Sequence, residues 1–362
     1  MTDTSQQSRA AAQDGTGASR GGGHAGGKPM RILHVLFSSR IAGSERYCID
    51  LANAQAALGH EVHVAGISGS PMAGELSPRV RFHGLSLPLF RGMRLRWLAR
   101  KIGADLAHAH LSPACKAVAR GPKGLAKVAT LHVGYKPRQH ARLDGVICVN
   151  RAQLKRLDDY GGRAVLIANW MPELEAGAPL DLRARLNLPR GTRLVGAVGR
   201  LHPSKGCDVL VSAFLKASPP DAALVLAGEG PQRAELEKLS GGDPRIHLIG
   251  HCANVPGFLA NLDLFVSPSR EETAGLAILE AMQAGLPIVS TATDGPSEYL
   301  AGHPVTLVEP GSVDHLAAAI GVAFQPDNIA GLARVCYDMR PFSRSAGVAN
   351  VLQFYSEIAA RP

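Results

Sequence analysis

Short runs of apolar residues alternate with segments of helical spacing along most of the chain. The first run is Arg31–Phe37, and after a short loop Glu45–Leu58 places apolar residues at the spacing of an amphipathic helix. Gly59 suits the end of that helix, and Glu61–Gly66 is a second apolar run. A strand, a helix and a strand at this spacing form a βαβ unit, so the pattern predicts a parallel, doubly wound sheet.

The alternation continues in two series. Further strands of the first series are expected near residues 80–83, 106–109, 127–131, 145–149 and 164–167, and those of the second series near 194–198, 223–227, 246–249, 264–267, 287–290 and 305–308. Two such series predict an α/β protein with two Rossmann-like, doubly wound parallel-sheet domains that face a cleft. Ligands of open α/β sheets bind beyond the carboxyl ends of the strands, so the loops there should carry the chemistry.

The 362 residues are enough for two ordinary domains, and the composition suggests where they divide. Residues 1–29 are rich in Gly, Ser, Ala and Gln, which predicts a disordered tail. We expect an N-terminal domain at 30–170, a linker at 171–190, a C-terminal domain at 191–342 and a C-terminal helix within 343–362.

The loop Gly199–Gly206 follows a predicted strand and precedes a predicted helix. Its Arg200 can donate two hydrogen bonds to phosphate oxygens, and Lys205 adds a second positive charge. The helix N-terminus behind them supplies unpaired N–H groups, so the loop is a candidate diphosphate site. The alternative is a solvated turn with two surface cations.

Two glutamates eight residues apart mark a second candidate loop, with Glu272 before a predicted helix and Glu280 within it. A carboxylate accepts hydrogen bonds from two hydroxyl groups, which suits neighbouring hydroxyls of a sugar or ribose. The amides of Gly275 and Leu276 open the helix and could bind a phosphate. The alternative is that Glu272 only complements the helix dipole and Glu280 lies on the surface. Because Glu280 stands in an apolar segment, where an unpaired carboxylate is costly, we favour a binding role.

Weaker candidates lie after strands of the first series. Gly43, in the loop after the first strand, allows the backbone to approach a ligand because it has no side chain. His132 follows a predicted strand and should face the cleft, although a structural role is the alternative. His108 and His110 form a His-x-His pair with no third ligand nearby, which is a poor metal site.

The chain contains no Asp-x-Asp pair, a spacing that would hold Mg²⁺ or Mn²⁺ against a diphosphate. This absence favours Arg200, Lys205 and helix dipoles as the groups that neutralise the diphosphate. We therefore expect no metal ion and no other cofactor.

The positive charge of the chain is concentrated in its first half. Residues 1–170 carry a net charge of +14 and residues 171–362 a net charge of −5. The first half should therefore face something anionic, such as a membrane surface, a phosphorylated glycolipid or nucleic acid. Arg91–Ile102 combines five cations with Met93 and Trp97, as interfacial helices do, and the alternative is a sheet-covering helix with a solvated basic face. Nucleic acid is disfavoured because stacking platforms and known motifs are missing.

The apolar runs of the sequence also bear on the location of the protein in the cell. No apolar run approaches the ~18 residues that span a membrane, and no apolar stretch typical of a secretory signal opens the chain. We expect a cytoplasmic protein that can lie peripherally on the inner face of the cytoplasmic membrane.

Taken together, these loops resemble glycosyltransferase family 4, also called group 1, whose members are retaining transferases of the GT-B fold. The resemblance extends from about Arg31 to Tyr355 and is most specific in VGRLHPSKG at 198–206 and EETAGLAILEAMQAGLPIVST at 271–291. The second segment resembles the E-x7-E motif of the family. Supporting segments are LVLAGEGP at 224–231, LDLFVSPS at 262–269, DLAHAH at 105–110, ATLH at 129–132 and IANW at 167–170.

The resemblance implies a catalytic or donor-binding role for five of the candidates. Arg200 and Lys205 would hold the diphosphate of a nucleotide-sugar donor, which is a substrate and not a cofactor. Glu280 would bind the ribose and Glu272 the hydroxyls of the transferred sugar. His132 would lie beside the donor sugar near the reacting carbon.

Further donor-binding positions follow from the same resemblance. Gly43 would lie in a loop that closes over the diphosphate and the acceptor, Gly275 and Leu276 would open the helix of the E-x7-E motif, and the backbone around Cys252 would border the nucleobase. The C-terminal helix would cross back onto the first domain, which would receive the acceptor. The chain departs from the family pattern at Ala274, where Phe or Tyr is frequent, at Ala42 and at Trp170.

The implied function is retaining, metal-independent transfer of a sugar from a UDP- or GDP-sugar to an anionic glycolipid or polysaccharide acceptor of the cell envelope. A first alternative is a transferase-like binding subunit without turnover, which the departures at Ala42 and Ala274 motivate. A second alternative is a nucleotide-sugar epimerase on the same fold.

Overall fold

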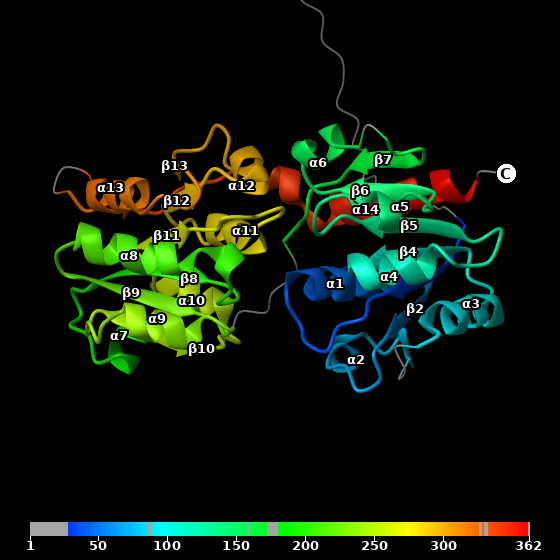
Figure 1. The fold of residues 1–362 in the computed structure, drawn as a ribbon, viewed down its shortest axis with the longest axis horizontal. Helices are drawn as coiled ribbons and strands as arrows, with labels where there is room; N and C mark the ends of the chain where they lie inside the picture. The colour runs from blue at the N-terminus through cyan, green and yellow to red at the C-terminus, as the bar shows by residue number, and fades with distance from the viewer. Residues whose placement is uncertain are drawn as a thin grey trace, which may run out of the picture.

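The structure is a computed structural model that describes residues 28–85, 89–157, 159–171, 180–325, 328 and 332–360. Almost all of the predicted tail, and residues 172–179 of the predicted linker, lie outside these ranges. Two α/β units stand side by side (Figure 1). The prediction of two Rossmann-like parallel-sheet units is confirmed.

All strand pairs of the first unit are parallel. Its seven-stranded sheet has the order β3-β2-β1-β4-β5-β6-β7. The strands are β1 (Arg31–Val35), β2 (Glu61–Gly66), β3 (Arg81–Gly84), β4 (Leu106–His110), β5 (Ala126–Thr130), β6 (Gly145–Cys148) and β7 (Arg163–Leu166). The strand order reverses between β1 and β4, which is the switch point where Rossmann folds bind ligands.

The second unit repeats this arrangement in a six-stranded parallel sheet with the order β10-β9-β8-β11-β12-β13. Its strands are β8 (Arg193–Val198), β9 (Ala222–Ala227), β10 (Ile246–Gly250), β11 (Leu264–Ser267), β12 (Ile288–Thr291) and β13 (Thr306–Val308). The switch point lies between β8 and β11, and the loops after these two strands contain the predicted diphosphate and glutamate segments.

Helices connect the strands. Those of the first unit are α1 (Gly43–Ala57), α2 (Met72–Glu75), α3 (Arg91–Ile102), α4 (Leu111–Val118), α5 (Pro137–His140) and α6 (Arg151–Lys155). Those of the second unit are α7 (Leu182–Arg185), the 3₁₀ helix η1 (Pro203–Lys205), α8 (Cys207–Ala217), α9 (Arg233–Leu239), α10 (Val255–Asn261), α11 (Leu276–Gln283), α12 (Asp294–Tyr299) and α13 (Val313–Ala323). The chain ends with η3 (Arg340–Phe342) and α14 (Arg344–Ala359). Within the described ranges, no helix combines the length and the apolar composition needed to cross a bilayer.

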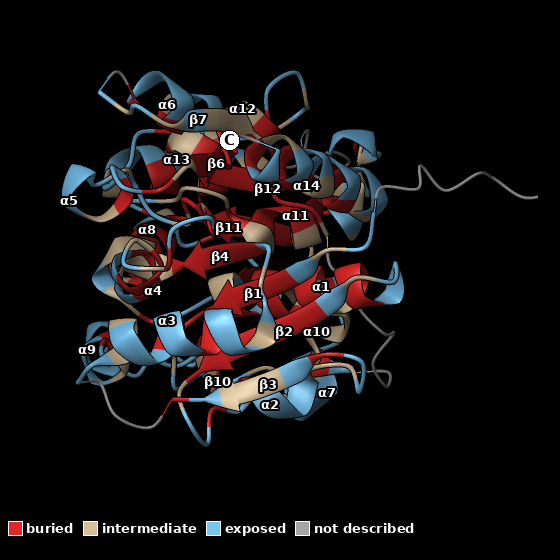
Figure 2. Ribbon diagram, turned by 90° about the vertical axis from the view of Figure 1, so that its right-hand side faces the viewer, coloured by how far each residue is buried: buried red, intermediate tan, exposed pale blue. Residues whose placement is uncertain are grey.

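Both faces of the sheets are buried. In β9, Leu224 and Leu226 belong to the core beneath α8 and α13, whereas Ala223 and Val225 belong to the core on the opposite face. Burial on both faces explains why the strands are continuous apolar runs and not alternating patterns. Figure 2 shows the buried strands of the first unit behind helices such as α3, whose outer surface is exposed.

Helix α14 follows the second unit in the sequence but packs on the first (Figure 1). An added Cβ at Gly145 of β6 would lie 2.7 Å from the ring of Phe354 and 3.0 Å from Ile358, so a residue without a side chain lets the helix approach the sheet. Tyr355 is fully buried in the same core as Ile32 of β1. The last helix therefore completes the core of the first unit.

Trp170 anchors the end of the first unit to α1 and α14. Its Nε1 donates a hydrogen bond to the carboxylate of Asp50 at 2.7 Å, and the same carboxylate accepts one from Nε of Arg344 at 2.9 Å. The ring of Trp170 lies 4.6 Å from that of Tyr47, and an added Cβ at Gly347 would lie 2.3 Å from it. The departure from the family pattern at Trp170 thus has a structural role here.

One helix boundary differs from the sequence prediction. The helix expected from Glu45 begins at Gly43, because the Glu45 carboxylate accepts a hydrogen bond from the amide of Ala42 at 3.0 Å and extends the first turn. Gly43 is therefore the first residue of α1 and not a loop residue. Within the predicted linker, Leu182 is fully buried in the core of the second unit, so the described end of this segment packs on that unit.

Candidate functional site

Close backbone contacts shape the loop after β8. An added Cβ at Gly228, in the loop after β9, would lie 1.7 Å from the carbonyl oxygen of Gly199, and Gly228 has a φ of 154°. Gly206, with a φ of 64°, would place a Cβ 2.1 Å from the carbonyl oxygen of Pro268 after β11. Only glycine satisfies both the backbone angle and the close approach at these two positions. The three loops therefore form one packed layer at the carboxyl end of the second sheet.

The two predicted diphosphate cations differ in their contacts. The ammonium group of Lys205, at the end of η1, donates a hydrogen bond to the Glu272 carboxylate. The other carboxylate oxygen of Glu272 accepts one from the amide of Gly275 at 3.1 Å. Arg200 is exposed and forms no ion pair with any residue of the described ranges. Lys205, Glu272 and Gly275 thus form one cluster, with Arg200 free beside the same strand end.

Sequence reasoning missed Arg270, which fixes this layer. Its guanidinium donates two hydrogen bonds to the Asp208 carboxylate at 2.8 and 2.6 Å and one to the carbonyl of Pro203 at 2.8 Å. The hydrogen bonds from Arg270 hold the pKa of Asp208 below its usual value. The only signal in the sequence is its place between β11 and the glutamate segment, which does not reveal its partners.

The N-terminus of α11 faces the first unit. Gly275 caps this helix with a φ of 66°, in the left-handed region that favours glycine. The next residue, Leu276, approaches α1 so closely that an added Cβ at Gly43 would lie 3.3 Å from its Cδ1. Two helix N-termini from different units therefore meet at this point. Because a helix N-terminus carries partial positive charge, the junction favours an anion.

Glu280 lies one to two turns further along α11. Burial raises the pKa of its carboxyl group to about 7, and the positive charge of Arg46 in α1 opposes this rise. Its carboxylate accepts no hydrogen bond from the residues that the structure describes. Sequence reasoning did not single out Arg46, which brings a cation of the first unit near this carboxylate. Glu280 is half-buried and its carboxylate has no protein partner among the described residues, so its oxygens are available to a ligand.

Cys252 lies near Glu280 in the loop after β10. Burial raises the pKa of its thiol, the positive charge of Arg185 lowers it and the negative charge of Glu280 raises it further. Its Sγ donates a hydrogen bond to the carbonyl of Asn254 at 3.3 Å. The side chain is therefore turned toward its own loop, which leaves the backbone of this segment as the part that could border a ligand.

The two units also touch at the segment between β6 and α6. The side-chain amide of Asn150 donates a hydrogen bond to the carbonyl of Thr273 at 2.7 Å, directly beside Glu272. The hydroxyl of Tyr299 donates one to the carbonyl of Val149 at 2.8 Å. These bonds, of which the second is buried, hold the glutamate loop of the second unit against the end of β6 in the first. Neither Asn150 nor Tyr299 was predicted as a site residue.

His132 follows β5 at the carboxyl edge of the first sheet and is half-buried. Its Nε2 lies 3.1 Å from Nδ1 of His110, and its ring packs edge-on to that of Tyr47 at 5.1 Å. Burial lowers the pKa of His132 to about 4, so the imidazole is neutral at pH 7. It can therefore hydrogen-bond a ligand but does not offer a positive charge.

The structure brings most of the predicted residues into contact, but not all. Glu272 accepts hydrogen bonds from both Lys205 and Gly275, and Leu276 lies beside Gly43 across the units. Glu280 and Cys252 interact electrostatically. Arg200 and His132 form no side-chain hydrogen bond or ion pair with the other predicted site residues within the described ranges.

The fold and this site define a GT-B glycosyltransferase. HepE from Anabaena, solved in complex with UDP-glucose, superposes with a TM-score of 0.75 at 24% identity, covering 91% of this chain and 98% of that one. WaaG, a glycosyltransferase involved in lipopolysaccharide biosynthesis, gives a TM-score of 0.69 at 18% identity, with 87% and 98% covered. At 24% and 18% sequence identity, these two likenesses show the fold alone.

Sequence comparison identifies the family. Residues 41–172 match Glycosyltransferase Family 4, and residues 192–325 match Glycosyl transferases group 1. The lipopolysaccharide core biosynthesis mannosyltransferase LpsB of Rhizobium meliloti is 30% identical over 292 residues, which cover 76% of this chain and 81% of LpsB. The core biosynthesis glycosyltransferase LpsE of the same organism is 28% identical over 306 residues, 80% and 88% of the two chains. The chain belongs to the family 4, or group 1, glycosyltransferases.

Proposed function

We propose that this chain is a retaining glycosyltransferase that uses no metal ion and transfers a sugar from a UDP- or GDP-sugar to a glycolipid or polysaccharide acceptor of the cell envelope. The observation that carries the proposal is the cluster of Lys205, Glu272 and Gly275 at the junction of the two units. It combines a cation, a carboxylate and a helix N-terminus, which suit a diphosphate joined to a sugar.

The relatives support the classes of donor and acceptor. HepE was solved with UDP-glucose, and a GDP-mannose-dependent phosphatidylinositol dimannoside mannosyltransferase of Mycobacterium tuberculosis is 32% identical over 171 residues, 45% of each chain. LpsB and LpsE act in the biosynthesis of a lipopolysaccharide core. A donor activated by UDP or GDP and an envelope acceptor follow from these likenesses as proposals for this chain.

In the proposed complex, the diphosphate lies at the N-terminus of α11 between Arg200 and Lys205. Arg200 is free to form two hydrogen bonds with phosphate oxygens. Lys205 exchanges Glu272 for the diphosphate, and Glu272 then accepts hydrogen bonds from sugar hydroxyls. The ribose hydroxyls reach Glu280, whose carboxylate gains the partners that it lacks in the free protein, and the backbone near Cys252 borders the base.

The proposed reaction exchanges two bonds at the anomeric carbon on one face of the sugar. The bond from that carbon to the diphosphate oxygen breaks, and the leaving negative charge is stabilised by Arg200, Lys205 and the helix dipole. The acceptor hydroxyl oxygen forms the new bond on the same face and gives its proton to a donor phosphate oxygen. The products are UDP or GDP and the extended acceptor, in which the transferred sugar keeps the anomeric configuration that it had in the donor.

The exposed surface of α3 supports contact with an anionic membrane surface. Leu95 and Leu98 pack on the sheet, whereas Phe90, Met93 and Trp97 are 60%, 63% and 62% exposed. Exposed cations of the same helix surround them, namely Arg94, Arg96, Arg100 and Lys101. Apolar side chains beside Arg and Lys are typical of helices that lie in a membrane interface. Blue-shifted Trp97 fluorescence with anionic but not neutral vesicles, measured in a Trp170→Phe background, would support this contact, and equal spectra would contradict it.

The experiment that tests the proposed function is a transfer assay preceded by a thermal-shift panel of UDP, GDP, ADP and their common sugars. We expect one nucleotide sugar to raise the melting temperature and, with an envelope glycolipid extract, to release its nucleoside diphosphate. NMR of the product should show the anomeric configuration of the donor. Binding without release would favour a binding subunit, and conversion of the donor sugar without acceptor would favour an epimerase.

A further inference from the structure

One face of the first sheet changes from apolar to polar toward the carboxyl ends of its strands. Ile32, Leu106 and Val128 are buried apolar residues of this face. Because side chains alternate along a strand, the same face then carries four buried polar residues, His34, His108, His110 and Thr130. Helices α1 and α14 cover it. Burying an imidazole costs free energy unless its nitrogen atoms have hydrogen-bond partners, so these partners are informative.

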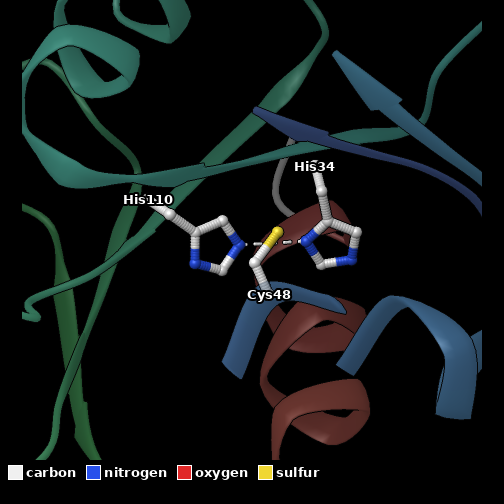
Figure 3. A group of neighbouring side chains, drawn as sticks. All are labelled: His34, Cys48 and His110. Atoms are coloured by element: carbon white, nitrogen blue, oxygen red, sulfur yellow. Dashed lines mark hydrogen bonds between the residues drawn. The ribbon is translucent and has the colours of Figure 1, made fainter. Parts of the chain in front are cut away.

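A continuous chain of side-chain contacts connects His132 to the interior. Nε2 of His132 lies 3.1 Å from Nδ1 of His110, and Nε2 of His110 lies 3.1 Å from Nδ1 of His34. Nε2 of His34 lies 2.7 Å from Oε1 of Gln55 in α1. Figure 3 shows the middle link, in which the two imidazole rings turn nitrogen atoms toward each other. The strand order β1-β4-β5 makes the chain possible, and because the register pairs His34 with His108 and His110 with Thr130, the contacts run diagonally across the ends of the strands.

The chain has a direction because its imidazoles are neutral. Burial lowers the pKa of His34 and His132 to about 4 and that of His110 well below its usual value. A neutral imidazole has one N–H group and one lone pair. The amide oxygen of Gln55 faces Nε2 of His34 and can only accept, so Nε2 of His34 donates to it, while the Gln55 amide nitrogen is buried without a hydrogen-bond partner among the described residues. It follows that Nε2 of His110 donates to His34, and Nε2 of His132 donates to His110. The opposite amide orientation would reverse the chain, and the tautomer measurement below distinguishes the two.

We propose that His110, His34 and Gln55 are positioning residues that hold His132 in its Nε2–H tautomer. The Nδ1 of His132, which has no partner in the described part of the chain, then keeps its lone pair. At the carboxyl edge of the sheet it accepts a hydrogen bond from a hydroxyl of the bound sugar. This inference rests on the proposed function, because it gives His132 a ligand that carries hydroxyl groups.

A buried metal ion is the alternative that the same residues suggest. Sγ of Cys48 lies with Nδ1 of His34 and Nε2 of His110 in a group whose atoms are all within 4.8 Å of one another (Figure 3). The sequence expectation that His110 has no third ligand nearby is therefore wrong, because β1 and α1 bring two. A metal ion would need the Cys48 thiolate and would break the bond between the two histidines. Burial raises the pKa of the Cys48 thiol, which disfavours the thiolate in the metal-free protein, and the metal analysis below decides between the two arrangements.

The first test needs no ligand and no activity. Long-range ¹H–¹⁵N NMR of the full-length protein labelled at histidine, at pH 7, distinguishes the two neutral tautomers and the charged ring. Signals are assigned with His34→Gln, His110→Gln and His132→Gln. We expect Nε2–H for all three residues and no bound metal by elemental analysis. An Nδ1–H or charged His132, or one equivalent of metal lost in His110→Gln, would overturn the proposal.

The second test separates an effect on turnover from an effect on nucleotide binding. His110→Leu removes both hydrogen bonds of the ring, whereas His110→Gln can still donate one and accept one. We expect His110→Leu to lower turnover about tenfold, the worth of one hydrogen bond, and to leave the dissociation constant of UDP or GDP unchanged. His110→Gln should recover most of this loss.

A matched control exists on the same sheet. Nδ1 of His63 in β2 lies 2.8 Å from Nε2 of His83 in β3, and His63 is buried. His63→Leu breaks the same kind of contact away from the chain of His132 and should leave turnover unchanged. Equal losses in His63→Leu and His110→Leu, or none in His110→Leu, would overturn the proposal. If the wild-type protein binds no nucleotide, the proposed function is wrong. The tautomer measurement still tests the hydrogen-bonded chain of histidines, because it needs no ligand.

Discussion

Lys205 and Glu272, 67 residues apart in the sequence, form an ion pair at the junction of the two units. The pair links the loop after β8 to the loop after β11, the two strands that flank the switch point of the second sheet. A ligand that brings both phosphate and hydroxyl groups can satisfy the two partners separately. In the complex that we propose, a nucleotide sugar would separate this pair and take its place.

Removing either diphosphate cation should weaken nucleotide binding, but with different effects on stability. We expect Arg200→Met and Lys205→Met each to raise the dissociation constant of UDP or GDP about 10- to 100-fold, the worth of charge-assisted hydrogen bonds. Only Lys205→Met should also lower the free energy of unfolding, because it leaves the Glu272 carboxylate without its ion partner. Calorimetric titration and urea denaturation measure the two effects. Lys238→Met, an exposed cation of α9, should change neither.

The carboxyl group of Glu280 should make stability depend on pH. Its pKa is about 7 in the folded protein against an ordinary value of 4.5, so the folded state binds the proton more tightly. The associated stability is fully present below pH 4.5 and is lost as pH rises through 7. Glu280→Gln should therefore raise the free energy of unfolding at pH 8 by an amount on the order of 2 kcal/mol, and less at pH 5.5. Glu271→Gln, at an exposed position, should show no such difference, and equal effects of Glu280→Gln at both pH values would contradict the assignment.

The close approach of Gly43 to Leu276 should be required for the units to meet. Because even a Cβ at Gly43 would lie 3.3 Å from Leu276, Gly43→Val should hold the two helix N-termini apart and lower turnover at least tenfold. The double variant Gly43→Val with Leu276→Ala should regain part of this loss. Gly74→Val in α2, where an added Cβ meets no atom within 4 Å, is the control. Full activity of Gly43→Val in a steady-state transfer assay would show that the contact is dispensable.

The positions of the strands follow directly from the sequence, and the physical reason is burial. A parallel strand covered on both faces is a continuous apolar run, so Glu61–Gly66 is found as β2 at its predicted bounds. The start of α1 was misplaced because it depends on one side-chain contact, between Glu45 and the amide of Ala42. The loop 199–206 was recognisable because it follows a predicted strand, precedes a predicted helix and carries Arg200 and Lys205. The structure adds that Gly206 could not carry a side chain there, because its Cβ would lie 2.1 Å from the carbonyl oxygen of Pro268.

The partners of the site residues could not be predicted in the same way. Arg46 reaches Glu280 only because the two units meet, and no spacing in the sequence encodes that meeting. The link from His110 to His34 depends on the order of the strands and on their register. Strand order could have suggested that these histidines share one end of the sheet. Which nitrogen atoms face each other depends on side-chain packing beneath α1 and α14.

Chelation should leave the reaction intact. The chain has no Asp-x-Asp pair, and the proposed donor site neutralises the diphosphate with Arg200, Lys205 and helix N-termini. We therefore expect unchanged turnover after dialysis against EDTA and no stimulation when Mg²⁺ or Mn²⁺ is added back. A loss of activity on chelation that either ion restores would contradict this account of the diphosphate site.

The central claim is that side chains of both units converge on one nucleotide sugar. Calorimetric titration of UDP and GDP into wild type and Glu280→Gln, side by side with Glu271→Gln, tests it most directly. We predict that at least one nucleotide binds wild type and Glu271→Gln with equal affinity, and that Glu280→Gln binds it at least tenfold more weakly. Binding of neither nucleotide to wild type, or equal binding by all three proteins, would contradict the claim.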